Sequence, residues 1–205
     1  MRQWFLSLAA LALVASPAFA GKYNKVVSIG DKAPAIAGVP AVDGDKEITM
    51  NLGDVKEDVV VVVFLANHCP VVQAVEDRLH EMVSAYKGKS VKFIGVCCSG
   101  TENYKDSDGI AGIKTKIKED KYNLTYAYDE SGKVGKAFGA TVTPQVFVLD
   151  KDRTIRYTGL LDDSQMNESK VTKPYTKLAV DALLAGETIE YSETKQNGCG
   201  VAYKR

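Results

Sequence analysis

The clearest pattern in the sequence is a continuous apolar run over residues 59–65, rich in β-branched valines. Such a run without alternation predicts a strand that is buried on both faces of a sheet. Apolar positions at helical spacing follow it and predict an amphipathic helix that begins near Pro70 and ends at Gly88: Val72, Val75, Leu79, Met82 and Tyr86. A second apolar run, residues 91–98, predicts another buried strand. Strand, helix and strand in this order predict a right-handed βαβ unit with parallel strands.

The rest of the chain predicts shorter elements. In chain order these are a turn-rich segment over 21–58 with a short strand at 47–50, a helix marked by Ile110, Ile113 and Ile117 with Ser107 or Asp108 as its cap, a short strand over 124–128, a short helix over 131–138 that ends at Gly139, a hairpin of strands 146–149 and 154–158, a polar loop over 162–173, and a helix from Pro174 to about 185. The last twenty residues are expected to form an irregular tail. The sequence contains no internal repeat and no domain boundary.

Residues 1–20 have the features of a secretory signal peptide. Arg2 gives a positive start, residues 4–14 are almost entirely apolar, and Ala18 and Ala20 are small residues at the two positions that a signal peptidase recognises. The apolar stretch is shorter than the ~20 residues needed to cross a bilayer. The sequence therefore predicts cleavage after Ala20, a periplasmic or secreted protein, and one mature domain over residues 21–205.

The charge of the chain argues against two classes of partner. Lys plus Arg and Asp plus Glu both number 26, so the formal net charge is zero. A nucleic-acid-binding protein needs a basic excess to neutralise phosphates, and docking on anionic lipid needs a basic surface. No apolar run after the signal peptide is long enough to span a membrane. The expected partners are therefore neither nucleic acids nor membranes.

Four cysteines, Cys69, Cys97, Cys98 and Cys199, lie in the predicted mature chain. In an oxidising compartment any two that are close in space can form a disulfide, and four cysteines allow three complete pairings. No Cys-x-x-Cys pair is present, and the only two histidines are His68 and His80, so the spacing does not fit a zinc site. The sequence predicts thiol chemistry or structural cystines, with no metal and no cofactor.

Cys69 is the candidate nucleophile, because it lies where the strand of residues 59–65 gives way to the following helix. Unpaired N–H groups and the positive dipole end of a helix stabilise a thiolate, which is the reactive form of cysteine. A protonated His68 beside it would add to this effect. The alternative is that Cys69 is a small buried apolar residue or one half of a structural cystine.

Several segments together resemble one known family. The chain is similar to the thioredoxin-like redoxin family, the group related to alkyl hydroperoxide reductase and thiol-specific antioxidant proteins. The similarity covers nearly all of the mature chain and rests on residues 30–34, 64–70, 76–79, 140–150 and 159–164, with Gly198-Cys199 in the tail. It implies an α/β thioredoxin-like fold, with a central mixed β-sheet flanked by helices, an N-terminal extension and a C-terminal tail.

The resemblance also implies a second site element, Thr143-Pro144. In this fold a Thr-Pro at this position is cis, packs beside the nucleophilic cysteine, and pairs with an extended substrate chain through the backbone of Thr143. An ordinary proline that opens an edge strand is the alternative. Cys69, Thr143 and Pro144 are therefore the predicted catalytic residues.

The chain departs from the family pattern at three positions. Val72 stands where thioredoxins have their second cysteine, and Val63 stands where they bury an acid. Ala66 stands where close redoxin relatives have a cysteine and where peroxiredoxins have a Thr or Ser that holds the peroxide. The arginine that peroxiredoxins use has no equivalent in residues 140–144. A local dithiol and efficient peroxidase chemistry are both placed in doubt.

A distant cysteine could replace the missing local partner. The carboxyl ends of adjacent parallel strands lie side by side, so Cys97 or Cys98 could end near Cys69, and alternation along the strand places the two on opposite faces. Cys199 in the tail is the other candidate. The alternatives are that Cys97 and Cys98 are buried core residues, or that one of them forms a structural cystine with Cys199.

Three hypotheses for function follow. The first is an exported thiol–disulfide oxidoreductase that acts on protein or small-molecule disulfides through Cys69 and is served by a distant cysteine or an external thiol reductant. The second is a thiol peroxidase in which peroxide oxidises Cys69 to a sulfenic acid. The third is a catalytically inactive thioredoxin fold that binds a partner, or copper through His68 and Cys69, where two ligands leave the coordination incomplete.

Overall fold

The computed structural model describes residues 21–99, 102–119 and 122–203. The predicted signal peptide, residues 1–20, lies outside the described residues. Nine strands are formed by the described residues: β1 (Val39–Asp43), β2 (Lys46–Met50), β3 (Val59–Leu65), β4 (Val91–Cys97), β5 (Thr125–Tyr128), β6 (Val142–Thr143), β7 (Gln145–Leu149), β8 (Ile155–Gly159) and β9 (Cys199–Gly200). Their helices are α1 (Pro70–Ala85), α2 (Lys105–Asp108), α3 (Ile110–Glu119), α4 (Lys133–Phe138) and α5 (Tyr175–Ala185), with 3₁₀ turns η1 (Leu52–Asp54), η2 (Glu102–Tyr104) and η3 (Glu168–Lys170).

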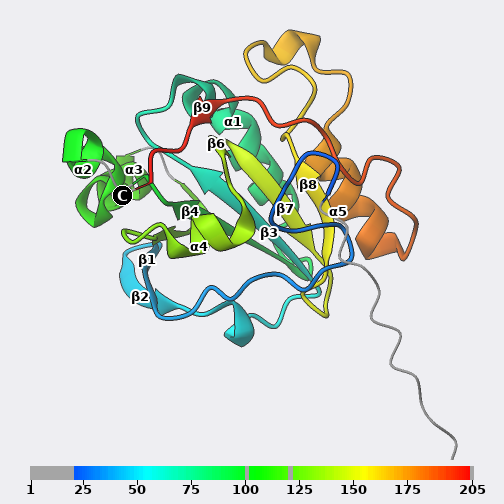
Figure 1. The fold of residues 1–205 in the computed structure, drawn as a ribbon, viewed down its shortest axis with the longest axis horizontal. Helices are drawn as coiled ribbons and strands as arrows, with labels where there is room; N and C mark the ends of the chain where they lie inside the picture. Colours follow the sequence, from blue (N-terminus) through cyan, green and yellow to red (C-terminus); the bar gives the residue numbers. More distant parts are fainter. Residues whose placement is uncertain (1–20, 100–101, 120–121, 204–205) are drawn as a thin grey trace, which may run out of the picture.

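A mixed sheet of seven strands forms the centre of the molecule, in the order β2-β1-β5-β4-β3-β7-β8 (Figure 1). β3, β4 and β5 are parallel, and α1 connects β3 to β4 as the predicted βαβ unit requires. β7 runs antiparallel to β3 and forms the predicted hairpin with β8. The β1–β2 hairpin pairs with the far edge through β5. The expected strand at 47–50 is thus part of β2, whereas its partner β1 was not predicted.

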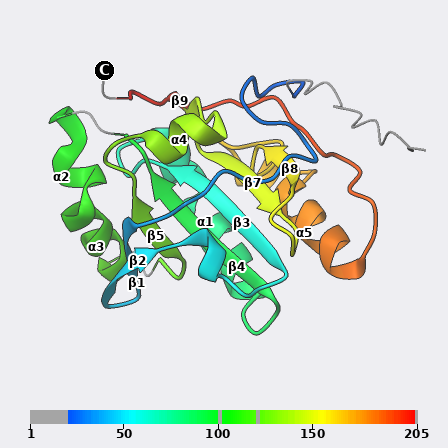
Figure 2. The same ribbon diagram turned by 60° about the horizontal axis from the view of Figure 1, so that its bottom comes forward.

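Strand β3 lies inside the sheet, and all seven of its residues are buried. Its side chains alternate between two apolar layers, because successive residues of a strand point to opposite faces. Val61 and Val63 pack in the layer formed with α1, α3 and α5, whereas Val60 and Val62 pack in the layer formed with α4 and the N-terminal segment. In Figure 2 the N-terminal segment, drawn in blue, runs across one face of the sheet. The unbroken valine run is thus explained by cover on both faces.

Two expected elements differ from the structure. Ser107 and Asp108 do not cap the helix of Ile110, because they belong to the short helix α2, which Gly109 separates from α3. The C-terminal tail is not wholly irregular, since β9 pairs antiparallel with β6. The colour gradient in Figures 1 and 2 shows this segment leaving α5 and running past β6 and α4. Among the described residues, no helix is both long and apolar enough to cross a membrane.

Candidate active site

Cys69 caps the N-terminus of α1, four residues after β3 ends. Its N–H donates to the carbonyl of Ala66 (3.0 Å), and its carbonyl accepts the N–H of Gln73 (3.0 Å). Pro70 occupies the first turn of the helix, where its missing N–H costs no hydrogen bond. The helix has 16 residues, so the N–H groups and the dipole at its start favour negative charge at the sulfur of Cys69.

Cys69 forms a disulfide with Cys199, 130 residues further along the chain. In the β6–β9 pairing Cys199 lies opposite Thr143, and Gly200 lies opposite Val142. A Cβ at position 198 would overlap the carbonyl oxygen of Thr143, so the glycine before Cys199 permits this close approach. Of the candidate partners, the structure selects the cysteine in the tail. The alternative in which Cys199 pairs with Cys97 or Cys98 is wrong.

The peptide bond between Thr143 and Pro144 is cis, as the resemblance implies. The sulfur of Cys69 lies 3.3 Å from the carbonyl oxygen of Thr143, which places this loop in contact with Cys69. The backbone of Thr143, expected to pair with an extended substrate, here pairs with the protein's own Cys199. In the reduced protein the thiol of Cys69 could donate to the Thr143 carbonyl, whereas the helix start favours the thiolate.

Cys97 and Cys98 are free thiols and fully buried. Cys97 packs in the same apolar layer as Cys69, and Cys98 packs in the opposite layer, as strand alternation predicts. Burial raises the pKa of the Cys97 thiol well above its ordinary value. Burial also raises the pKa of the Cys98 thiol, to about 12. Both sulfurs therefore remain protonated at neutral pH, which fits the interpretation of buried core residues.

His68 contacts a partner that the sequence did not suggest. Its Nδ1 lies 2.6 Å from Oδ2 of Asp108, and its backbone N–H donates to Oδ1 of the same side chain (3.3 Å). The imidazole stacks on the ring of Tyr104, with centroids 3.6 Å apart. Asp108 is completely buried. These contacts fix the turn before Cys69 against α2, and a copper site of His68 with Cys69 has no support because the sulfur is bonded to Cys199.

Asn67 adds a second set of contacts to the same turn. Its Nδ2 donates to the carbonyl of Ser107 (2.6 Å), and its Oδ1 accepts from the hydroxyl of Tyr126 (3.0 Å). The side chain of Gln73 donates to the Asn67 carbonyl (2.9 Å). The turn is therefore bonded to strand β5, helix α1 and helix α2. Sequence reasoning gave no role to Asn67 or Tyr126 and considered Asp108 only as a helix cap, because nothing local in the sequence indicates their contacts with this turn.

The three departures from the family pattern lie in apolar surroundings. Val63 and Val72 are buried in the layer that contains Cys69. Ala66 is buried as well and contributes only its backbone carbonyl to Cys69. No group of three or more His, Cys, Asp or Glu side chains among the described residues is arranged to bind a metal ion.

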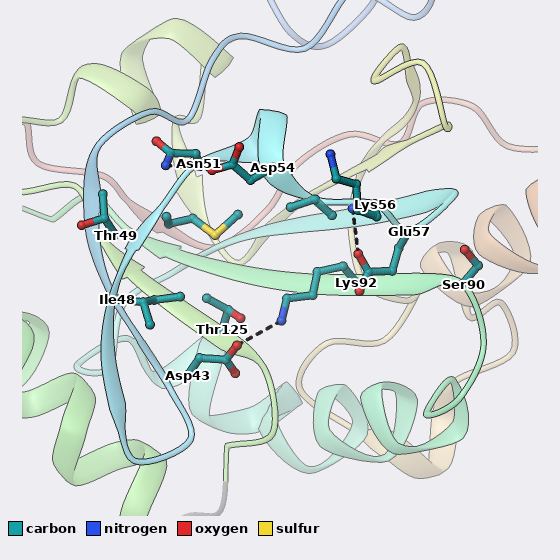
Figure 3. Close-up of a pocket in the computed structure, with 12 residues that line it drawn as sticks. Asp43, Ile48, Thr49, Asn51, Asp54, Lys56, Glu57, Ser90, Lys92 and Thr125 are labelled. Atoms are coloured by element: carbon teal, nitrogen blue, oxygen red, sulfur yellow. Dashed lines mark hydrogen bonds and ion pairs between the residues drawn. The ribbon is translucent and has the colours of Figure 1, made fainter.

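A surface hollow of about 510 Å³ lies at the other end of the sheet (Figure 3). Ser90 and Lys92 line it at the start of β4, and Lys92 Nζ lies 3.2 Å from a carboxylate oxygen of Asp43 across it. Cys69 follows the opposite, carboxyl end of β3. The hollow is therefore separate from the thiol chemistry.

Comparison with known proteins identifies the family. A profile of the AhpC/TSA family matches residues 29–158. The chain belongs to the AhpC/TSA family. This assignment confirms the resemblance inferred from the sequence motifs. A search for similar sequences among curated proteins finds no match.

Several solved structures have the same fold. An uncharacterized conserved protein from Geobacillus kaustophilus is 32% identical, with a TM-score of 0.78 over 86% of this chain and 92% of that chain. A hypothetical protein from Sinorhizobium meliloti 1021 is 23% identical, with a TM-score of 0.78 over 88% of this chain and 97% of that chain. The thioredoxin domain of a thiol-disulfide oxidoreductase from Bacteroides vulgatus is 22% identical, with a TM-score of 0.53 over 70% and 96%. The fold of this AhpC/TSA member is thioredoxin-like, as predicted.

Proposed function

We propose that this protein is an exported thiol–disulfide oxidoreductase in which Cys69 is the nucleophile and Cys199 is the resolving cysteine. The observation that supports this most is the disulfide between them, which joins the start of α1 to the strand beside Thr143. Cys199 thereby takes the role of the second cysteine that thioredoxins have at the position of Val72. The Bacteroides vulgatus protein, which is described as a thiol-disulfide oxidoreductase, has the same fold and is consistent with the proposal.

The catalytic cycle starts from the dithiol form. The thiolate of Cys69 attacks one sulfur of a substrate disulfide, forms a mixed disulfide, and releases the other substrate sulfur as a thiolate. The thiolate of Cys199 then attacks the sulfur of Cys69, which releases the second substrate thiol and forms the Cys69–Cys199 bond. Two electrons pass from the protein to the substrate, and two protons accompany them.

An external thiol restores the dithiol, and the geometry favours attack on Cys199. Cys69 is fully buried, whereas Cys199 is partly exposed. Cys69 then departs as a thiolate, which the start of α1 stabilises, and a good leaving thiolate speeds the exchange. A second reductant thiol attacks the reductant sulfur of this mixed disulfide, which forms the disulfide of the reductant and releases Cys199 as a thiol.

Export is the second part of the proposal. Its support is the predicted signal peptide at residues 1–20, with cleavage after Ala20. The mature domain of residues 21–205 would then function in the periplasm or outside the cell, where disulfides form and persist. Mass spectrometry of the processed protein, recovered from an extracytoplasmic fraction, would test this with Gly21 as the expected first residue.

The test of the chemistry is a trapping experiment with insulin as the disulfide substrate. We expect Cys199→Ser to accumulate a mixed disulfide between Cys69 and insulin, because the second step lacks its nucleophile. Cys69→Ser should form no adduct and lose insulin reduction by at least about a hundredfold, since a hydroxyl is not ionised at neutral pH. Cys97→Ala, which removes the other buried free thiol and leaves the tail contacts intact, is the matched control and should keep wild-type activity.

The peroxidase hypothesis is an outcome of the same experiment. If Cys69→Ser abolishes hydrogen peroxide consumption and leaves insulin reduction unchanged, the protein is a peroxidase and the proposal is wrong. Ala66, which supplies no hydroxyl to hold a peroxide, favours the oxidoreductase. If folded Cys69→Ser protein keeps every activity of the wild type, Cys69 is not catalytic and the inactive binding fold is the better description.

A further inference from the structure

The chain beyond Cys199 makes contacts that the proposed reaction does not itself require. The N–H of Val201 donates to the carbonyl of Thr141 (3.0 Å) and extends the pairing of β9 with β6. Tyr203 then packs on α4, and its hydroxyl donates to the carbonyl of Ala140 (2.5 Å). The tail is therefore bonded to the protein on the far side of the cysteine as well as at the cysteine.

Tyr203 occupies a narrow slot whose walls lack side chains. A Cβ on Gly132 would lie 2.6 Å from Cδ1 of Tyr203, and a Cβ on Gly135 would lie 2.6 Å from its hydroxyl oxygen. The thiol of Cys98 lies 4.0 Å from the same hydroxyl. We call this site, formed by Gly132, Gly135, Cys98 and the carbonyl of Ala140, the Tyr203 slot. It accepts a ring only because two of its residues are glycines.

The tail is also fixed before Cys199, at Thr194. The backbone N–H of Thr194 donates to the carbonyl of Thr158 (3.1 Å), and its hydroxyl accepts the N–H of Leu160 (2.9 Å). Cys199 therefore lies between two docked positions, five residues after Thr194 and four residues before Tyr203. A short segment held at both ends visits far fewer positions than one held at a single end.

We propose that Tyr203 is a positioning residue for the resolving cysteine: its seat in the Tyr203 slot keeps the reduced Cys199 opposite Thr143 and within reach of Cys69. This inference rests on the proposed function, because it assigns a cause to the stability of that disulfide. The fraction of time that the Cys199 thiol spends beside Cys69 sets the equilibrium constant for closing the bond. By reciprocity, the closed disulfide stabilises Tyr203 in its slot by the same factor.

The test is a redox titration in glutathione buffers. It measures the exchange in which the protein dithiol and oxidised glutathione give the Cys69–Cys199 disulfide and two reduced glutathiones. We expect Tyr203→Ala to lower this equilibrium constant by about tenfold, which corresponds to a reduction potential about 30 mV less negative. Tyr203→Phe keeps the ring and loses only the hydroxyl, so it should lower the equilibrium constant by about threefold.

Two further variants make the test specific. Tyr191→Ala removes a tail tyrosine that lies before Thr194 and packs against Tyr175, so it should leave the equilibrium constant unchanged. Gly135→Ala narrows the slot from its other wall and should reproduce the effect of Tyr203→Ala, and the two effects should not add because both act on one contact.

The outcomes separate this inference from the proposed function. If Tyr203→Ala titrates like the wild type while Cys69→Ser remains inactive, the positioning role is wrong and the proposed function stands. If the wild type forms no Cys69–Cys199 bond at any glutathione ratio, the proposed function fails, and the inference fails with it. An equal shift in Tyr203→Ala and Tyr191→Ala would also overturn the inference, because the effect would then be general to the tail.

Discussion

The four cysteines form two pairs at the same end of the sheet, and the two pairs have different chemistry. Leu65 at the end of β3 lies beside Cys97 at the end of β4, so Cys69 and the Cys97–Cys98 pair follow neighbouring strand ends. Cys69 and Cys199 are joined, whereas Cys97 and Cys98 are free thiols. Burial does not make this difference, because Cys69 is as completely buried as Cys97.

The difference arises from how the backbone presents each sulfur. Cys69 is on a helix start with a short strand, β6, beside it, and that strand pairs with β9 and so brings Cys199 into register. Cys97 and Cys98 are adjacent in sequence, so their side chains enter opposite apolar layers. Cys97 and Cys98 are thus kept apart although they are adjacent in sequence. Cys69 and Cys199 are joined, because strand pairing brings them together across 130 residues.

The largest expected effect is in alkylation of the two pairs. After mild reduction of the folded protein, we expect iodoacetamide to modify Cys69 and Cys199, and to modify Cys97 and Cys98 at least about a thousandfold more slowly. After reduction, separation of the two-residue strand β9 from β6 is enough to expose Cys69, whereas exposing Cys97 and Cys98 requires an opening of the central sheet that costs more than about 4 kcal/mol. Pulse labelling followed by peptide mass spectrometry measures all four rates in one sample.

The unreduced protein is the control for this labelling. It should show no modified cysteine until denaturant is added, and then only Cys97 and Cys98. Rapid labelling of Cys97 in the folded protein would break the comparison between the pairs, because it would make a strand cysteine accessible to a partner.

Much of this architecture could be predicted from the sequence. The apolar run over 59–65 has the same limits as β3, and the helical spacing after it corresponds to α1. These elements are predictable because their burial is set by local pattern. Strand β1 was missed, because residues 39–43 contain a proline, an aspartate and only three apolar side chains among turn-rich neighbours.

The site was only partly predictable, for a physical reason. Cys69 and Pro144 stand beside elements with a clear pattern, so their placement followed from local sequence and the family resemblance. The partnership of Asp108 with His68 and the slot for Tyr203 depend on residues 40 and about 70 positions apart, and nothing local in the sequence specifies them. The tail appeared irregular because β9 has two residues and is defined only by its partner.

After the difference in alkylation, the next largest expected effect is the loss of stability when the Cys69–Cys199 disulfide is removed. Opening the Cys69–Cys199 bond frees a loop of about 130 residues, so reduction should lower the free energy of unfolding by about 2–4 kcal/mol. Chemical denaturation of Cys199→Ser and wild type measures this difference. Cys98→Ala should lower the free energy of unfolding by only about 1 kcal/mol, since this variant removes one small buried group. Equal losses in both variants would mean that the disulfide does not stabilise the fold.

A smaller effect distinguishes the turns that follow β3 and β5. Asp108 accepts from the N–H of His68, and Asp129 accepts from the N–H of Gly135 (2.9 Å). Alanine at either position leaves buried donors unpaired and should cost about 1–3 kcal/mol of stability. Only Asp108→Ala should also lower kcat/KM for insulin reduction, by about tenfold, because only Asp108 orients the turn before Cys69. An equal loss of activity in Asp129→Ala would contradict this separation.

The last expected effect is a pH dependence that arises from one pair alone. Burial raises the pKa of the Cys98 thiol to about 12, whereas an ordinary thiol titrates near 9. The unfolded chain therefore releases this proton first as pH rises, so the stability associated with the neutral thiol is complete below pH 9 and is lost between pH 9 and 12.

Denaturant titrations of wild type and Cys98→Ala between pH 8.5 and 11 test this. The difference between their free energies of unfolding should fall with pH, with a slope that approaches about 1.4 kcal/mol per pH unit. Cys69 and Cys199 add nothing to this slope while they are bonded, because a disulfide does not titrate. Tyrosine ionisation is common to both proteins and largely cancels. A difference that stays constant with pH would mean that water reaches Cys98 in the folded state, and that the strand cysteines are less distinct from the active pair than their burial implies.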